Sequence, residues 1–178
     1  MVEHVVVVAR PAAEVAFHPV VSDLVNLCYF RSDSDQPWTR VGNSDPSYHP
    51  GFRLADADSF HGQFYEEMGG ILHQKLLHRF PGAAAGHVVE RYSGIWGITP
   101  DYQPILDRLT YAPGLYCAVG FSGHGYKLSP VIGDLMSRWI LAGEAPEPEV
   151  LNLFRWSRFA ENEPIKAPLS YSRAVGLR

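Results

Sequence analysis

The sequence predicts an α+β fold, with a mixed, largely antiparallel sheet accompanied by few helices. Two observations lead to this prediction. Short runs rich in β-branched and aromatic residues recur along the chain, and only two segments carry the apolar spacing of a helix. One of these helices directly follows a short strand, which gives a single β-loop-α unit instead of a regular series of such units.

The expected strands are spread along the chain. The β-branched run from His4 to Ala9 predicts a buried strand, and Leu24 to Arg31 with Trp38 to Gly42 predicts a hairpin with a long polar turn. Two further strands are expected, a long one at Val88 to Ile98 and a short buried one at Leu115 to Val119. A hairpin pairs its two strands antiparallel, in line with the fold class.

The two expected helices are marked by apolar spacing and by signals at their ends. The first has Asp58 or Ser59 available as its N-cap and ends at Pro81-Gly82. Its apolar face is formed by Phe64, Met68, Ile71, Leu72 and Leu76. The second begins at Ser129-Pro130 and ends before Gly143. Its inner side is formed by Val131, Ile132, Leu135, Met136, Trp139 and Ile140.

Composition excludes several classes of protein. The hydrophobic fraction of 46% and charged fraction of 19% are ordinary for a soluble globular protein, and a net charge of −4 gives no reason to expect nucleic acid. No apolar stretch approaches the length of a membrane span. Cys28 and Cys117 lie in apolar runs, which favours buried free thiols and a cytoplasmic location. No metal site is expected, because the histidines show no ligand spacing.

The most informative segment is a glycine loop between the last expected strand and the last helix. Gly120, Gly123 and Gly125 remove side chains there, and the helix N-terminus and Lys127 add positive potential, a combination that favours an electron-rich or anionic group. The order GxxGxG differs from the GxGxxG of a primary dinucleotide-binding motif. From the residues alone, a tight turn and a ligand-binding loop both remain open.

Two segments resemble a known family. Residues 114–130, GLYCAVGFSGHGYKLSP, are similar to the closing segment of the sarcosine oxidase and glycine oxidase flavoenzymes, within the D-amino-acid oxidase superfamily. Residues 92–106, YSGIWGITPDYQPIL, resemble the segment that precedes it in that family. A looser similarity extends from His18 to Phe159. The paired motifs at a short separation are more specific than either motif alone.

The resemblance implies a site. In that family the loop matching this one lies against the flavin ring, so the cofactor-binding residues would be Gly120, Phe121, Ser122, Gly123, His124, Gly125, Tyr126 and Lys127. Lys127 matches the lysine that binds the substrate carboxylate, and Trp96 falls where glycine oxidases place a carboxylate-binding arginine. Arg40 falls near the position of the lysine that oxidases use to speed their reaction with oxygen, and an arginine there leaves both an oxidase and a dehydrogenase open. Gly94 stands at the flavin-linking cysteine of sarcosine oxidases, so FAD is expected to bind non-covalently.

The implied function is part of an FAD-dependent oxidoreductase that oxidises the C–N bond of a small amine or amino acid. Residues 1–113 lack the strand, GxGxxG turn and helix that hold the ADP half of FAD. Residues 1–159 are therefore expected to form the substrate-binding domain with a flavin-contacting segment at 114–143, followed by a tail at 160–178. A partner chain, a truncated gene or a proteolysed product would each explain the missing N-terminal half. The apolar surface that this half would cover predicts self-association or a heteromeric assembly. The alternative is a non-catalytic remnant or interaction subunit.

Overall fold

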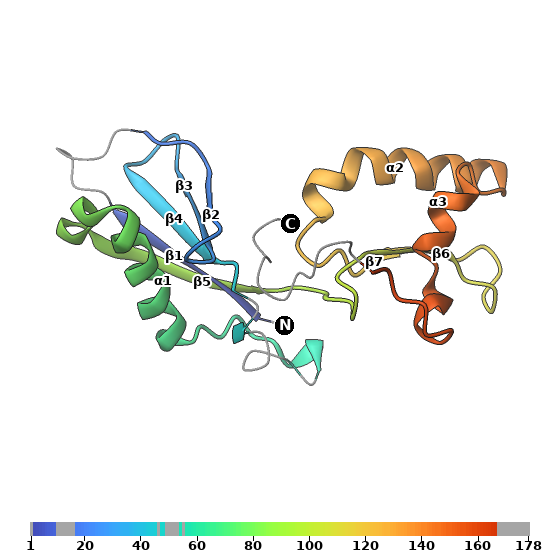
Figure 1. Ribbon diagram of the computed structural model, residues 1–178, viewed down its shortest axis with the longest axis horizontal. Helices are drawn as coiled ribbons and strands as arrows, with labels where there is room; N and C mark the ends of the chain where they lie inside the picture. The colour runs from blue at the N-terminus through green and yellow to red at the C-terminus, as the bar shows by residue number, and fades with distance from the viewer. Residues whose placement is uncertain (1, 10–16, 46, 49–53, 55, 167–178) are drawn as a thin grey trace. The chain divides into compact units, whose positions relative to one another are not determined.

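The computed structural model describes every residue except 1, 10–16, 46, 49–53, 55 and 167–178. The described chain forms two compact units, one up to Ile95 and one that begins at Trp96 (Figure 1). Each unit has its own sheet and its own hydrophobic cluster. No helix in the described residues is long and apolar enough to cross a membrane.

The first unit is a five-stranded antiparallel sheet in the order β2-β3-β4-β1-β5. Its strands are β1 (Val2–Ala9), β2 (Val21–Asp23), β3 (Cys28–Ser32), β4 (Trp38–Asn43) and β5 (His87–Ile95). The helix α1 (Glu66–Arg79) packs on the sheet, with short 3₁₀ helices η2 (Ala57–Ser59) before it and η3 (Pro81–Ala85) after it. This arrangement confirms the α+β fold class with antiparallel strands and few helices.

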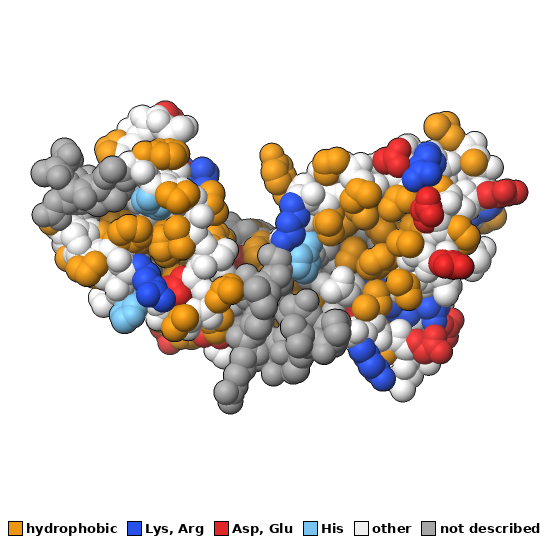
Figure 2. Space-filling model, turned by 45° about the horizontal axis from the view of Figure 1, so that its top comes forward, with side chains coloured by type: hydrophobic (Ala, Val, Ile, Leu, Met, Phe, Trp, Pro, Cys, Tyr) orange, Lys and Arg blue, Asp and Glu red, His pale blue; other side chains and the backbone are white. Residues whose placement is uncertain are grey.

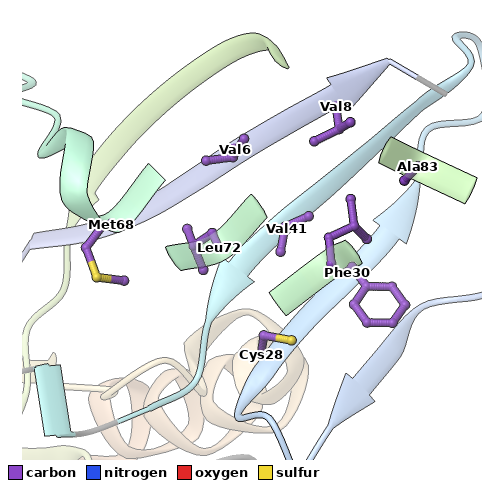
Figure 3. Close-up of a cluster of buried hydrophobic side chains, with 9 residues drawn as sticks. Val6, Val8, Cys28, Phe30, Val41, Met68, Leu72 and Ala83 are labelled. Carbon is purple, nitrogen blue, oxygen red and sulfur yellow. The ribbon is translucent and has the colours of Figure 1, made fainter. Parts of the chain in front are cut away.

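The core of the first unit lies between α1 and one face of this sheet. Figure 3 shows Val6, Val41 and Phe30 from three strands close to Leu72 of α1. Side chains alternate between the two faces of a strand, so Val7, which pairs with Arg40 and with Glu90, lies on the opposite face. The sheet therefore has one apolar face under α1 and one face that carries charged side chains.

The second unit is smaller. It contains the antiparallel pair β6 (Ile105–Arg108) and β7 (Tyr116–Val119), the helices α2 (Gly125–Ala142) and α3 (Pro148–Leu153), and the 3₁₀ helix η4 (Trp156–Phe159). Leu106 of β6, Met136 of α2 and Leu151 of α3 form the centre of its core. The Tyr116 and Trp139 rings pack edge to face beside them, 5.7 Å between centroids.

Two strand predictions are wrong in their bounds. The strand expected at Leu24 to Arg31 begins only at Cys28, because residues 24–27 form a turn between β2 and β3. The carboxylate of Asp23 holds this turn by accepting hydrogen bonds from the main-chain N–H groups of Val25 and Asn26, each 3.0 Å long. At the other end, β5 stops at Ile95, and Ile98 forms only an isolated bridge with Phe121.

The predicted helix starts are wrong as well. Tyr65 stands at the N-cap of α1, whereas Asp58 and Ser59 belong to η2. The helix α2 begins at Gly125, ahead of the predicted Ser129-Pro130. Pro130 has no N–H to donate to the carbonyl of Tyr126, and the Ser129 hydroxyl donates to that oxygen instead, at 2.9 Å. Proline is thereby tolerated inside the helix.

The predicted burial at the strand before α2 is also wrong, and two elements were missed. Leu115 is 47% exposed and Val119 is 45% exposed, because β7 has only β6 as a strand partner among the described residues. On α2, Val131 and Ile140 are exposed although the spacing places them on the inner side. The sequence pattern did not reveal β6 or α3. The predicted tail at 160–178 lies outside the described residues from 167 onward.

Candidate functional site

The glycine loop joins β7 to α2 and turns through left-handed backbone angles. Gly120 has φ +67°, Gly123 has φ +86°, and Ser122 between them has φ +49°. Glycine adopts such angles freely, whereas other residues rarely do. The loop lies along residues 96–99: the N–H of Ser122 donates to the carbonyl of Gly97 at 3.0 Å, and Ile98 pairs with Phe121.

Two of the glycines also permit close packing. A Cβ built on Gly123 would lie 2.8 Å from Cζ3 of Trp96, and a Cβ on Gly120 would lie 2.5 Å from Cγ2 of Thr99. Both distances are shorter than van der Waals contact, so only glycine fits at either position in this arrangement. Trp96, which the sequence placed in the site, is therefore packed against Gly123.

The N-terminus of α2 is open and carries positive potential. The first amides of a helix have no acceptor within it, which applies here to Gly125, Tyr126 and Lys127. No acidic residue stands in this first turn, and Tyr126 is 97% exposed. The side chain of Lys127 is exposed and forms no ion pair within the described part of the chain. This end of the helix can receive an anionic or electron-rich group.

Arg40 lies in the first unit, on the sheet face opposite α1, and its charge is already compensated. Its Nε and Nη2 each donate to the carboxylate of Asp33 at 2.9 Å, and Nη1 donates to the hydroxyl of Tyr92 at 3.2 Å. The hydrogen bonds to Asp33 and then to Tyr92 raise the pKa of Arg40 above its ordinary value. Arg40 is a permanently charged group held in place by neighbours.

Most of the residues singled out from the sequence therefore share one unit. Trp96 and the loop from Gly120 to Lys127 come together in the second unit, whereas Arg40 belongs to the first. Among the described residues, no group of three or more His, Cys, Asp or Glu side chains could hold a metal ion. Sequence reasoning assigned no role at the site to Thr99, Asp101 or Arg158. Thr99 and Arg158 are buried, and so is the side chain of Asp101, beside this loop or the segment that packs on it.

Residues 2–139 match the family model described as FAD dependent oxidoreductase, which covers more than half of the chain. The match covers the antiparallel sheet of the first unit, and β7, the glycine loop and all but the last three residues of α2. The chain therefore belongs to the FAD-dependent oxidoreductase family.

Two curated relatives are sarcosine oxidases. The monomeric sarcosine oxidase of Arthrobacter sp. (strain TE1826) is 30% identical over 99 residues, which is 54% of this chain and 25% of that protein. The human peroxisomal sarcosine oxidase is 43% identical over 61 residues, which is 34% of this chain and 15% of that protein. These matched segments span a quarter or less of the relatives' length.

Solved structures share the fold at lower identity. The L-proline dehydrogenase of P. horikoshii has a TM-score of 0.74 and 18% identity, over 92% of this chain and 41% of that one. The fructosyl amine:oxygen oxidoreductase (Amadoriase I) of Aspergillus fumigatus has a TM-score of 0.70 and 22% identity, over 93% of this chain and 40% of that one. At such identities the likeness shows the fold alone.

Proposed function

We propose that this chain forms part of an enzyme that oxidises the C–N bond of a small amine or amino acid, sarcosine- or glycine-like, by hydride transfer to FAD. The observation that carries the proposal is the open N-terminus of α2, with its glycine loop and Lys127. Sarcosine and proline, which relatives and structural neighbours act on by name, are both amines that bear a carboxylate. A cation beside an electron-rich cofactor suits such a substrate.

The residues present fit the isoalloxazine end of FAD. A bound flavin would supply the hydride acceptor and would gain negative charge on reduction. The backbone of Gly123, His124 and Gly125 and the first amides of α2 would stabilise that charge, since they form the positive end of the helix and no carboxylate opposes them there. Binding is proposed to be non-covalent, because Gly94 offers no side chain for a link.

In the second unit, two side chains are proposed to act on the substrate. Lys127 binds the carboxylate as a point charge, and Trp96, packed on Gly123, limits the space beside it. Arg40 is proposed as a catalytic cation, and its contacts with Asp33 keep it charged. With FAD bound, a hydride would pass from the substrate carbon to the flavin and the amine proton would pass to water, giving an imine. A further water would hydrolyse this imine to a carbonyl compound and an amine.

The ADP half of FAD needs residues that this chain does not carry in a GxGxxG arrangement. We propose that a partner chain with that motif completes the site, or that the chain self-associates through its exposed apolar surface without completing it. The second unit has surface for such an assembly: Figure 2 shows hydrophobic side chains gathered on it. Leu141, Ile140 and Val131 of α2 and Val119 of β7 are among its exposed apolar residues.

Titration of the purified chain with FAD, followed by visible absorption and flavin fluorescence, tests cofactor binding directly. We expect a bound flavin spectrum either with the chain alone or after co-expression with a GxGxxG-bearing partner. Absence of flavin under both conditions would favour the non-catalytic interaction subunit.

Substitution of Lys127 tests the substrate role in the FAD-loaded protein. Lys127→Ala should lower kcat/KM for sarcosine roughly 10- to 100-fold, because a charge-assisted hydrogen bond contributes about 1.5–3 kcal/mol. An N-methylated amine without a carboxylate should be almost unaffected. Lys166→Ala, which removes another exposed lysine of the same unit, is the matched control and should change neither value. Equal losses with both substrates would remove the assigned role.

A further inference from the structure

The second unit contains a buried ion pair between Asp101 and Arg158. The side chain of Arg158 is 0% exposed and that of Asp101 is 1% exposed. The two residues form a two-pronged contact, with Nε of Arg158 donating at 2.8 Å and Nη2 at 3.0 Å to the two carboxylate oxygens. Nothing in the proposed chemistry uses this pair directly.

Every proton of the Arg158 guanidinium is donated. Besides the two bonds to Asp101, Nη2 donates to the carbonyl of Gln103 at 2.9 Å, and Nη1 donates to the carbonyls of Phe154 and Arg155 at 3.0 Å each. These acceptors lie in the segment before β6 and at the end of α3. The planar guanidinium thus hydrogen-bonds to both of these stretches of main chain and holds them in a fixed geometry relative to each other.

Asp101 is equally saturated. Apart from Arg158, its carboxylate accepts from the main-chain N–H groups of Gln103 at 3.1 Å and Ile165 at 3.0 Å. Burial by itself would raise the pKa of Asp101, but the hydrogen bonds from Arg158, Ile165 and Gln103 outweigh it and hold the pKa below its ordinary value. The carboxylate is therefore ionised near neutral pH and fixed from several directions.

From this pair, a short chain of contacts leads to the glycine loop. The Gln103 carbonyl that accepts from Arg158 also accepts from the Thr99 hydroxyl, at 2.7 Å. The main-chain N–H of Thr99 donates to the buried hydroxyl of Ser122 at 3.2 Å, and that hydroxyl donates to the carbonyl of Gly120 at 3.2 Å. The methyl group of Thr99 also occupies the space that a Cβ on Gly120 would need.

A buried ion pair is a poor source of stability, because the loss of hydration offsets most of its attraction and apolar residues of similar volume often serve as well. Such a pair does fix local geometry, because each of its hydrogen bonds to the main chain sets the position of one backbone group. Here one of the fixed residues, Gln103, belongs to the segment on which the glycine loop rests, and its carbonyl is shared with the Thr99 hydroxyl. The other fixed groups, in Phe154, Arg155 and Ile165, tie that segment to the chain after α3. The geometry of the Asp101–Arg158 pair therefore suits a role in fixing the conformation of a loop better than a role in stabilising the second unit as a whole.

We propose that Arg158 and Asp101 are positioning residues, which hold residues 96–103 so that Trp96 and the glycine loop keep the shape needed at the N-terminus of α2. The relevance of this shape to catalysis rests on the proposed function. The positioning itself is a property of the chain alone.

Hydrogen exchange of the full chain without flavin, read by mass spectrometry, tests the pair. Arg158→Lys keeps the charge but loses the planar, two-pronged contact. Amides in residues 97–103 and 120–125 should then exchange at least 10-fold faster, whereas residues 132–139 of α2 and the strands β1 and β4 keep their rates. Arg155→Lys is the matched control, because Arg155 pairs with Glu161 and Glu163 at the surface, and it should leave the loop unchanged.

Asp101→Asn provides a second variant, since it removes the charge with little change in volume, and the same two segments should loosen. Unchanged exchange in these segments, or an equal rise throughout α2, would overturn the positioning role. FAD titration of the same proteins separates the two proposals. If the wild-type protein never binds FAD, the proposed function is refuted. If the variants nevertheless show the expected faster exchange, the positioning role stands.

Discussion

At the scale of single residues, Gly123 is constrained both by its backbone angle and by its neighbour. Its φ of +86° is left-handed, and an added Cβ would meet the Trp96 ring. Gly143, which ends α2 with φ +74°, has the same backbone requirement, but an added Cβ would meet nothing within 4 Å. The two positions therefore separate the cost of the angle from the cost of the contact.

We expect Gly143→Ala to lower the free energy of unfolding by about 1–2 kcal/mol, the usual cost of a left-handed angle for a residue with a Cβ. Gly123→Ala should cost more, because the Trp96 ring must also move. Urea unfolding followed by tryptophan fluorescence gives both values. Equal losses at the two positions would show that Trp96 yields without cost and does not restrict the site.

The residue scale also shows what the sequence could predict of the site. The glycines and Lys127 are neighbours in sequence, so their spacing alone indicated the loop and the cation. Asp101 and Arg158 are 57 positions apart, and no local pattern joins them. Asp33 is only seven positions from Arg40, yet the pairing depends on the register of β3 and β4, which the sequence does not fix.

At the scale of elements, α1 carries two adjacent glycines in different surroundings. An added Cβ on Gly70 would meet nothing within 4 Å, whereas one on Gly69 would lie 3.0 Å from the Phe64 ring. Phe64 in turn packs edge to face on the ring of His4, 5.2 Å between centroids, and cannot easily yield. Helical propensity favours alanine at both sites, but packing opposes it at Gly69.

Gly70→Ala should therefore raise the free energy of unfolding by roughly 0.5–1 kcal/mol, the usual gain from alanine inside a helix. Gly69→Ala should give a smaller gain or a loss. Thermal unfolding followed by far-ultraviolet circular dichroism compares the two variants. An equal gain at both positions would mean that Phe64 adapts freely.

The elements also show why some boundaries escaped prediction. The apolar spacing of α1 was a good guide, because Met68, Leu72 and Leu76 all face the sheet. Ser129-Pro130 resembles a helix start, but α2 starts earlier, at Gly125, in the loop that Phe121 anchors by pairing with Ile98. That bridge joins residues distant in sequence, so the capping pattern at Ser129-Pro130 placed the helix start too late in the chain. The short strand β6 and helix α3 likewise depend on tertiary contacts rather than on length or spacing.

At the scale of the whole molecule, both units contain the same kind of ion pair. Each holds a nearly buried aspartate against an arginine: Asp23 with Arg79 in the first unit, and Asp101 with Arg158 in the second. The hydrogen bond from Arg79 is the main cause that lowers the pKa of Asp23, and the pKa of Asp101 is also lowered. Both units should therefore respond to acid in the same direction, each through its own carboxylate.

The sign of this response follows from linkage. A carboxyl group with a lowered pKa in the folded state stabilises fully above its unfolded value, near 3.8, and the stabilisation is lost as the pH falls through the folded pKa. Asp23→Asn should lower the stability of the first unit at pH 7 and flatten its decline below about pH 5, whereas Asp101→Asn should flatten the acid-induced opening of residues 97–103 in the second unit. Hydrogen exchange at several pH values, read separately for β1 and for residues 97–103, distinguishes the two responses. If each variant changed the acid response of both units equally, the two units would unfold as one, and the pairs would not act locally.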